Sequence, residues 1–181
     1  VQSLVGSEMC IRDSLKIKWV FMAKKEVYKL PFFRTAAKSF NFIKVDRSDK
    51  NDRKSINEQA KTLFSNGWSL MVYPQGTRAK KDNFLPFKSG AFHIALDNNI
   101  PILPVVIAGT GDIWPRGGKF MTSGKAIINT LEPIDISKYT KETIDQLVEE
   151  TYEKMSNVYK ELTASIKSVS YTHLRAHETL D

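Results

Sequence analysis

Cysteine is almost absent from this sequence of 181 residues, since Cys10 is the single one. A disulfide framework is therefore excluded. No apolar run approaches the roughly 20 residues that a transmembrane helix requires, and the best apolar stretch, residues 100–108, contains two prolines. Glycine and proline, 9 and 7 residues, are too few for collagen or a disordered low-complexity chain. The length is what one folded domain needs.

Basic residues outnumber acidic ones. The sequence has 27 Lys and Arg against 20 Asp and Glu, which gives a formal net charge of +7. A basic surface attracts anions, whether phosphorylated small molecules, acidic lipids or nucleic acid. Charge alone does not choose among these classes of partner.

The two ends of the chain are related to each other at the level of codons. Positions whose numbers sum to 182 can be encoded by reverse-complementary codons, without a break from Val1/Asp181 to Asp13/Val169. The segment LVGSEMCIRDS at 4–14 also resembles a translated sequencing-library adapter. The alternative is a natural basic tail that contains two histidines.

We therefore expect residues 1–14 and 168–181 to be derived from an adapter. On this interpretation Cys10 says nothing about the redox compartment, and His173 and His177 are not candidate ligands or catalytic residues. Residues 15–167 are expected to be one domain that lacks sequence before Leu15.

Apolar runs alternate with helical patterns along this domain. Strands are predicted at residues 18–23, 41–46, 69–73, 102–108 and 125–131, and helices after Pro31 and at 49–66 and 90–98, with Gly67 as a C-cap. A long amphipathic helix follows, with Thr140 as its N-cap and apolar residues from Ile144 to Ile166. That helix covers a core or, alternatively, binds a membrane or a partner. The alternation predicts an α/β fold with a mixed, largely parallel sheet flanked by helices.

Two segments place arginine where a strand ends. Arg47 follows residues 42–46, where it can reach a crevice beyond the sheet, although a solvated charge is the simpler interpretation. Gly76, Thr77 and Arg78 follow the strand at 69–73. Glycine lets a ligand approach the backbone, and guanidinium binds phosphate through paired hydrogen bonds. The alternative for the second segment is an ordinary polar turn.

A third segment, FLPFKSGA at 84–91, puts apolar bulk beside a cation. Lys88 precedes a helix whose first N–H groups favour an anion. An amphiphile with a phosphate headgroup would suit this combination, whereas the alternative is a loop held to the core by its aromatic side chains. The fourth segment, IPILPVV at 100–106, is interpreted as structural support.

Taken together, these segments resemble the 1-acylglycerol-3-phosphate acyltransferase family of glycerolipid acyltransferases. Arg47 matches the arginine of that family's second block, Gly76, Thr77 and Arg78 match its glycine-threonine-arginine block, and residues 100–106 match its fourth. The segments FMAKKE at 21–26 and PFF at 31–33 are also similar. The resemblance covers nearly all of residues 15–167.

The resemblance implies an enzyme of phospholipid biosynthesis. It would move an acyl chain from acyl-CoA or acyl carrier protein to the free hydroxyl of 1-acylglycerol-3-phosphate, with no metal or other cofactor. The substrate-binding residues would be Arg47, Gln75, Gly76, Thr77, Arg78 and Lys88. The partners would be the lysophospholipid, the acyl thioester, acyl carrier protein and the membrane surface. The protein would be associated with the cytoplasmic face of the membrane. Nucleic acid is not expected among them.

The sequence departs from the family pattern in two places. Gln75 stands where the family usually has glutamate, so an acceptor oxygen is kept and a charge is lost. The family's catalytic motif, Asn-His-x4-Asp before the FMAKKE segment, does not occur. His93 and Asp97 are four residues apart instead of five, so we interpret His93 as a structural helix residue. No catalytic residue is therefore assigned, and this chain is expected to be inactive.

Two further interpretations remain open. One is a relative that binds phosphate or lipid without catalysis. The other is a basic α/β module that binds nucleic acid, although no RNA-binding aromatic motif occurs and an apolar loop at 84–87 flanks the cations. A basic segment would support membrane contact or be an ordinary solvated helix face; it contains Lys24, Lys25, Lys29, Arg34 and Lys38.

Overall fold

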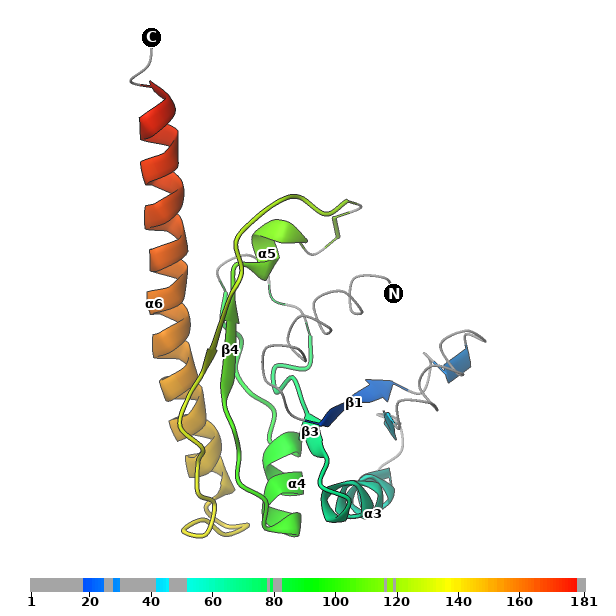
Figure 1. Ribbon diagram of the computed structural model, residues 1–181. Helices are drawn as coiled ribbons and strands as arrows, with labels where there is room; N and C mark the ends of the chain where they lie inside the picture. Colours follow the sequence, from blue (N-terminus) through cyan, green and yellow to red (C-terminus); the bar gives the residue numbers. More distant parts are fainter. Residues whose placement is uncertain are drawn as a thin grey trace. The chain divides into compact units, whose positions relative to one another are not determined.

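The structure is a computed structural model, and Figure 1 shows its ribbon. It describes residues 18–24, 28–29, 42–45, 52–77, 79, 83–115, 117–118 and 120–178. The side chains of residues 23–24, 52–53 and 169–178 are outside this description. The chain divides into two compact units, Val1–Tyr73 with His93–Asn99, and Pro74–Phe92 with Ile100–Asp181.

The first unit contains a three-stranded parallel sheet in the order β2-β1-β3. The central strand β1 spans Trp19–Lys24, and its neighbours are β2 at Ile43–Val45 and β3 at Ser69–Met71. Met22 pairs with Ile43 on one side of β1, and Val20 pairs with Leu70 on the other. Parallel pairing requires crossover connections, and helix α3 lies in the one between β2 and β3.

Helix α3 at Asp52–Ser65 packs one face on this sheet. Its buried residues Ile56, Ala60 and Leu63 recur at the spacing of one helix face, as the sequence predicts. They join Val20 and Ile43 in one core cluster. Gly67 follows the end of the helix as the expected C-cap: it has φ +71° and donates its N–H to the carbonyl of Phe64 at 3.0 Å.

The strand expected at 69–73 is shorter and less buried than its apolar sequence indicates. It ends at Met71, Ser69 is exposed, and Leu70 and Met71 are only partly buried. Tyr73, beyond the strand, is 46% exposed and stacks on Phe21 with a centroid distance of 6.1 Å. Apolar residues in a short run do not show by themselves whether both faces of a strand are covered.

The second unit pairs β4 at Val105–Ala108 with β5 at Ile127–Thr130 in antiparallel register. The pairing continues as an isolated bridge, in which Ile102 and Ile134 exchange backbone hydrogen bonds of 3.1 and 2.7 Å. Helix α6 at Ile144–Glu178 runs alongside β4, as Figure 1 shows. Leu147 of α6 is fully buried in this unit.

Helix α6 begins later than predicted. The Oγ1 of Thr143 accepts a hydrogen bond of 2.8 Å from the N–H of Thr140, and the Thr143 carbonyl accepts the N–H of Leu147 at 3.3 Å. Thr143 is therefore the residue that precedes the first helical turn. Two threonines three residues apart offer the same capping chemistry, so composition alone does not distinguish them.

Two shorter helices complete the described elements. Helix α4 at Gly90–Asn98 has the predicted bounds, and the division between the two units falls within it. Helix α5 at Thr110–Ile113 was not expected from the sequence. The parallel sheet, the antiparallel pair and the flanking helices confirm the predicted mixed α/β class. Among the described residues no helix is long and apolar enough to cross a membrane.

Candidate anion-binding site

Lys88 and Gly76, from two separate sequence segments, meet in the second unit. The side chain of Lys88 lies over the backbone of Gly76: a Cβ added to Gly76 would come within 3.2 Å of the Lys88 Cε and 3.3 Å of its Nζ. The N–H of Lys88 also donates to the carbonyl of Pro74 at 2.8 Å. Gly76 has φ +68°, a conformation in which glycine avoids the steric cost of a side chain. The Lys88 side chain and its ammonium therefore lie against the backbone of Gly76.

Gln75 fixes the loop that carries this ammonium. Its Nε2 donates a hydrogen bond of 3.3 Å to the carbonyl of Leu85. A carbonyl oxygen only accepts, so an ionised glutamate at this position could not make the same contact. Gln75 thus has a structural role in this chain, because it ties residue 75 to the loop before Lys88.

An aromatic cluster supports the same loop from helix α6. The ring of Phe84 lies 5.5 Å from that of Tyr152 and 5.1 Å from that of Tyr159, and the ring of Phe87 lies 5.3 Å from that of Tyr152. The Oη of Tyr152 donates to the carbonyl of Phe84 at 3.2 Å. The alternative of a loop held by its aromatic side chains is confirmed by these contacts. Both tyrosines belong to the predicted apolar face of this helix, but the sequence does not predict their contact with the loop. Their spacing of seven residues on one helix face was the available signal.

The other predicted binding residues are Arg47, Thr77 and Arg78. Thr77 is exposed and follows Gly76 directly. Arg47 and Arg78 lie outside the described residues, as does most of the basic segment at 24–38. Gln75, Gly76 and Lys88 are thus the predicted binding residues for which the described contacts show a shared location. Their roles in binding remain predictions.

Asp97 has a structural contact within the first unit. Its Oδ2 accepts a hydrogen bond of 2.6 Å from the Nδ2 of Asn57, which links helices α4 and α3. His93, one turn earlier on α4, is partly buried. The described part of the chain contains no group of three or more His, Cys, Asp or Glu side chains that could hold a metal ion.

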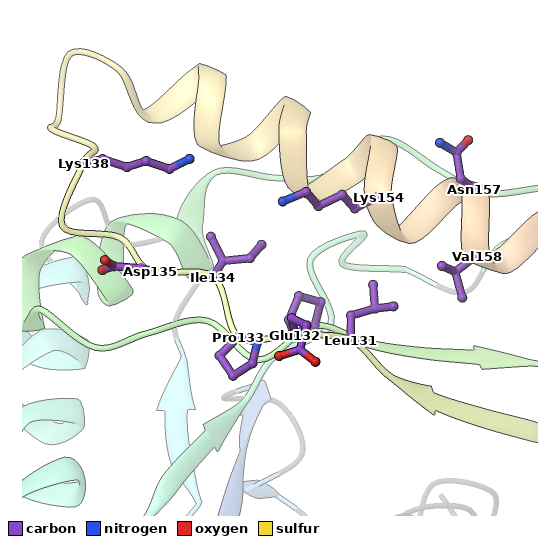
Figure 2. Close-up of a pocket in the computed structure, with 10 residues that line it drawn as sticks. Leu131, Glu132, Pro133, Ile134, Asp135, Lys138, Lys154, Asn157 and Val158 are labelled. Carbon is purple, nitrogen blue, oxygen red and sulfur yellow. The ribbon is translucent and has the colours of Figure 1, made fainter.

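A separate hollow lies between α6 and the segment after β5, and Figure 2 shows the residues that line it. Its volume is about 510 Å³. Lys138 and Lys154 line it together with Glu132 and Asp135, so its formal charges balance. Lys154 and Val158 line the hollow from α6, as Figure 2 shows. The positions of Tyr152 and Tyr159 in the sequence of α6 put them on a different face of the helix. The hollow is therefore distinct from the Gly76–Lys88 contact, and its balanced charge does not select an anion.

Comparison with known proteins places these features in a family. A family model described as Acyltransferase matches residues 8–108. The chain belongs to this acyltransferase family. It is 34% identical over 131 residues to a 1-acyl-sn-glycerol-3-phosphate acyltransferase of Cocos nucifera, covering 72% of this chain and 42% of that protein. It is 30% identical over 148 residues to the enzyme of that name from Haemophilus influenzae, covering 81% and 61%.

A solved structure gives the same family assignment. The crystal structure of the 1-acyl-sn-glycerophosphate (LPA) acyltransferase PlsC from Thermotoga maritima matches with a TM-score of 0.66 and 27% identity, covering 81% of this chain and 56% of PlsC. The acyltransferase chain described here thus spans less than two thirds of the length of each of these relatives.

Proposed function

We propose that this chain is the headgroup-binding part of a phospholipid-biosynthesis acyltransferase. The enzyme would move an acyl chain from acyl-CoA or acyl carrier protein to the free hydroxyl of 1-acylglycerol-3-phosphate. The observation that carries this proposal is the Lys88 ammonium held against the backbone of Gly76. An ammonium can make a charge-assisted hydrogen bond to a phosphate, and the relatives are named for an acceptor that carries one.

The residues of this chain would act by positioning. Lys88 Nζ would contact the phosphate, Gly76 would let it approach, and Gln75 would keep the Lys88 loop in place. By resemblance to the family, Arg47, Thr77 and Arg78 would complete the contacts. Holding the headgroup fixes the distance between the acceptor hydroxyl and the thioester, which lowers the entropic part of the barrier.

Acyl transfer also requires a base. The hydroxyl oxygen attacks the thioester carbonyl, its proton passes to a histidine oriented by an aspartate, and the thiol leaves with a proton. The family supplies both groups from Asn-His-x4-Asp, which this sequence does not contain. We therefore propose that the chain binds the acceptor at the cytoplasmic face of a membrane and does not itself transfer the acyl group. No metal is required for this chemistry.

Binding of a short-chain, water-soluble lysophosphatidic acid by calorimetry tests the headgroup site. Lys88→Ala should weaken binding at least tenfold, because a hydrogen bond to a charged group contributes about 1.5–3 kcal/mol. The matched control is Lys61→Ala, which removes an exposed charge from helix α3 and should leave the affinity unchanged. Equal affinities for wild type and Lys88→Ala would contradict the proposal.

A second measurement tests the missing base. Transfer from acyl-CoA to lysophosphatidic acid should stay at the uncatalysed level with this chain, and His93→Ala should make no difference. Transfer that depends on the protein and disappears in His93→Ala would show that His93 is a catalytic base and that the proposal is wrong.

A further inference from the structure

Two large apolar side chains are strongly exposed in the loop between α5 and β5. Phe120 is 82% exposed and its neighbour Met121 is 65% exposed. The other exposed large hydrophobic side chains of the described residues, Tyr73 and Leu103, stand alone in the sequence and are less than half exposed. Exposed apolar residues that stand alone are common, but an adjacent pair at this exposure indicates a contact surface.

The loop is closed by its own hydrogen bonds. The N–H of Thr122 donates to the carbonyl of Ile113 at 2.9 Å, and its Oγ1 donates to the carbonyl of Asp112 at 2.9 Å. The Nε1 of Trp114 donates to the carbonyl of Gly118 at 2.8 Å. The apolar pair therefore projects from a loop whose ends are fixed.

The charge of the loop is entirely positive. Residues 114–126 contain Arg116, Lys119 and Lys125 and no acidic residue, and Lys125 is exposed. Apolar side chains next to cations are what an anionic lipid surface binds, because the apolar groups enter the acyl-chain boundary while the cations stay at the phosphates. A stable protein interface needs about 800 Å² from each partner, more than two side chains provide.

We propose that the loop between α5 and β5 is a membrane-docking loop. Phe120 and Met121 insert at the boundary between headgroups and acyl chains of an anionic bilayer, and the exposed Lys125 contacts a lipid phosphate. This inference deepens the proposed membrane association and rests on it, because it names the surface that makes the contact. Membrane docking by this loop does not require the Gly76–Lys88 site, since the loop can bind any anionic lipid.

Vesicle flotation tests the loop independently of the headgroup site. Vesicles of phosphatidylcholine with about one third phosphatidylglycerol, free of lysophosphatidic acid, should bind the wild-type chain, and pure phosphatidylcholine should bind it less. Phe120→Ser/Met121→Ser should reduce binding to the anionic vesicles at least tenfold. Leu103→Ser, at a 41% exposed site in the same unit, should have no effect. The double variant should still bind soluble lysophosphatidic acid, whereas Lys88→Ala should still bind the vesicles.

Insertion has its own spectroscopic readout. In Phe120→Trp, brominated lipid should quench more tryptophan fluorescence than in the wild type, whose three tryptophans give the baseline. Unchanged vesicle binding by the double variant, or no additional quenching in Phe120→Trp, would overturn the proposal. Self-association that the double variant abolishes, without any vesicle binding, would assign the loop to a second copy of the chain instead.

Discussion

Gly76 and Gly67 share a backbone conformation but differ in their surroundings. Their φ angles are +68° and +71°. A Cβ on Gly76 would meet the side chain of Lys88, whereas a Cβ on Gly67 would meet nothing within 4 Å. The pair therefore separates the cost of a left-handed backbone from the effect of displacing Lys88.

Gly76→Ala and Gly67→Ala should each lower the free energy of unfolding by about 1–2 kcal/mol, because an L-residue is strained at positive φ. Only Gly76→Ala should also weaken binding of soluble lysophosphatidic acid, by several-fold, since the flexible Lys88 side chain must move away. Urea unfolding and calorimetry measure the two effects. Equal loss of binding in both variants would show that the effect is general destabilisation.

At the scale of residues, the sequence predicts the members of the candidate binding site better than the contacts between them. Gly76 and Lys88 were predicted as members of two separate segments, and the turn that brings them together depends on backbone angles that composition does not specify. The hydrogen bond from Gln75 to Leu85 could not be predicted either. Arg47 and Arg78, which lie outside the described residues, stay predictions.

At the scale of elements, helices were predicted more accurately than strand partners. The bounds of α4 are those expected, and the buried face of α3 follows its 3.6-residue period. The antiparallel pairing of β4 with β5 is not predicted, because its register depends on residues far away in the sequence, such as Val105 and Thr130. Helical periodicity is local, so a sequence shows it directly.

A titratable hydrogen bond links the segment before α6 to the second turn of the helix. Tyr139 donates its Oη to the Oε2 of Glu150 at 2.7 Å, and Gln146 donates to the Oε1 at 3.0 Å. These hydrogen bonds, that of Tyr139 first, hold the pKa of Glu150 below its ordinary value of 4.5. A lowered carboxyl pKa stabilises the fold above the ordinary value, and this contribution is lost as the pH falls through the lowered one.

The melting temperature should therefore fall more between pH 5 and pH 3 for the wild type than for Glu150→Gln, which cannot titrate. At neutral pH, Glu150→Gln should melt somewhat lower than the wild type, because a neutral acceptor makes a weaker hydrogen bond. Glu149→Gln, which removes an exposed carboxylate from the same turn, is the control. Parallel melting curves for all three proteins across this range would contradict the assignment.

At the scale of the whole molecule, family membership and net charge point to different partners. The family model matches residues 8–108, whereas the charge of +7 would also suit nucleic acid. The two interpretations predict different responses to charge removal. Non-specific binding to a polyanion depends on the number of cations and not on their positions, whereas a headgroup site depends on particular side chains.

Lys88→Ala and Lys61→Ala, which each remove one exposed cation, should therefore weaken binding to an oligonucleotide equally and slightly. That binding should be in the non-specific range, with a Kd of about 10⁻⁴–10⁻⁶ M, and should fall steeply with salt because counterions are released. Soluble lysophosphatidic acid should instead distinguish the two variants. Fluorescence anisotropy with labelled single- and double-stranded oligonucleotides measures the first response, and calorimetry measures the second. Tight oligonucleotide binding that resists salt, together with equal lysophosphatidic acid affinities, would favour the nucleic-acid module, because a lipid headgroup site has no reason to prefer a polymer of phosphates.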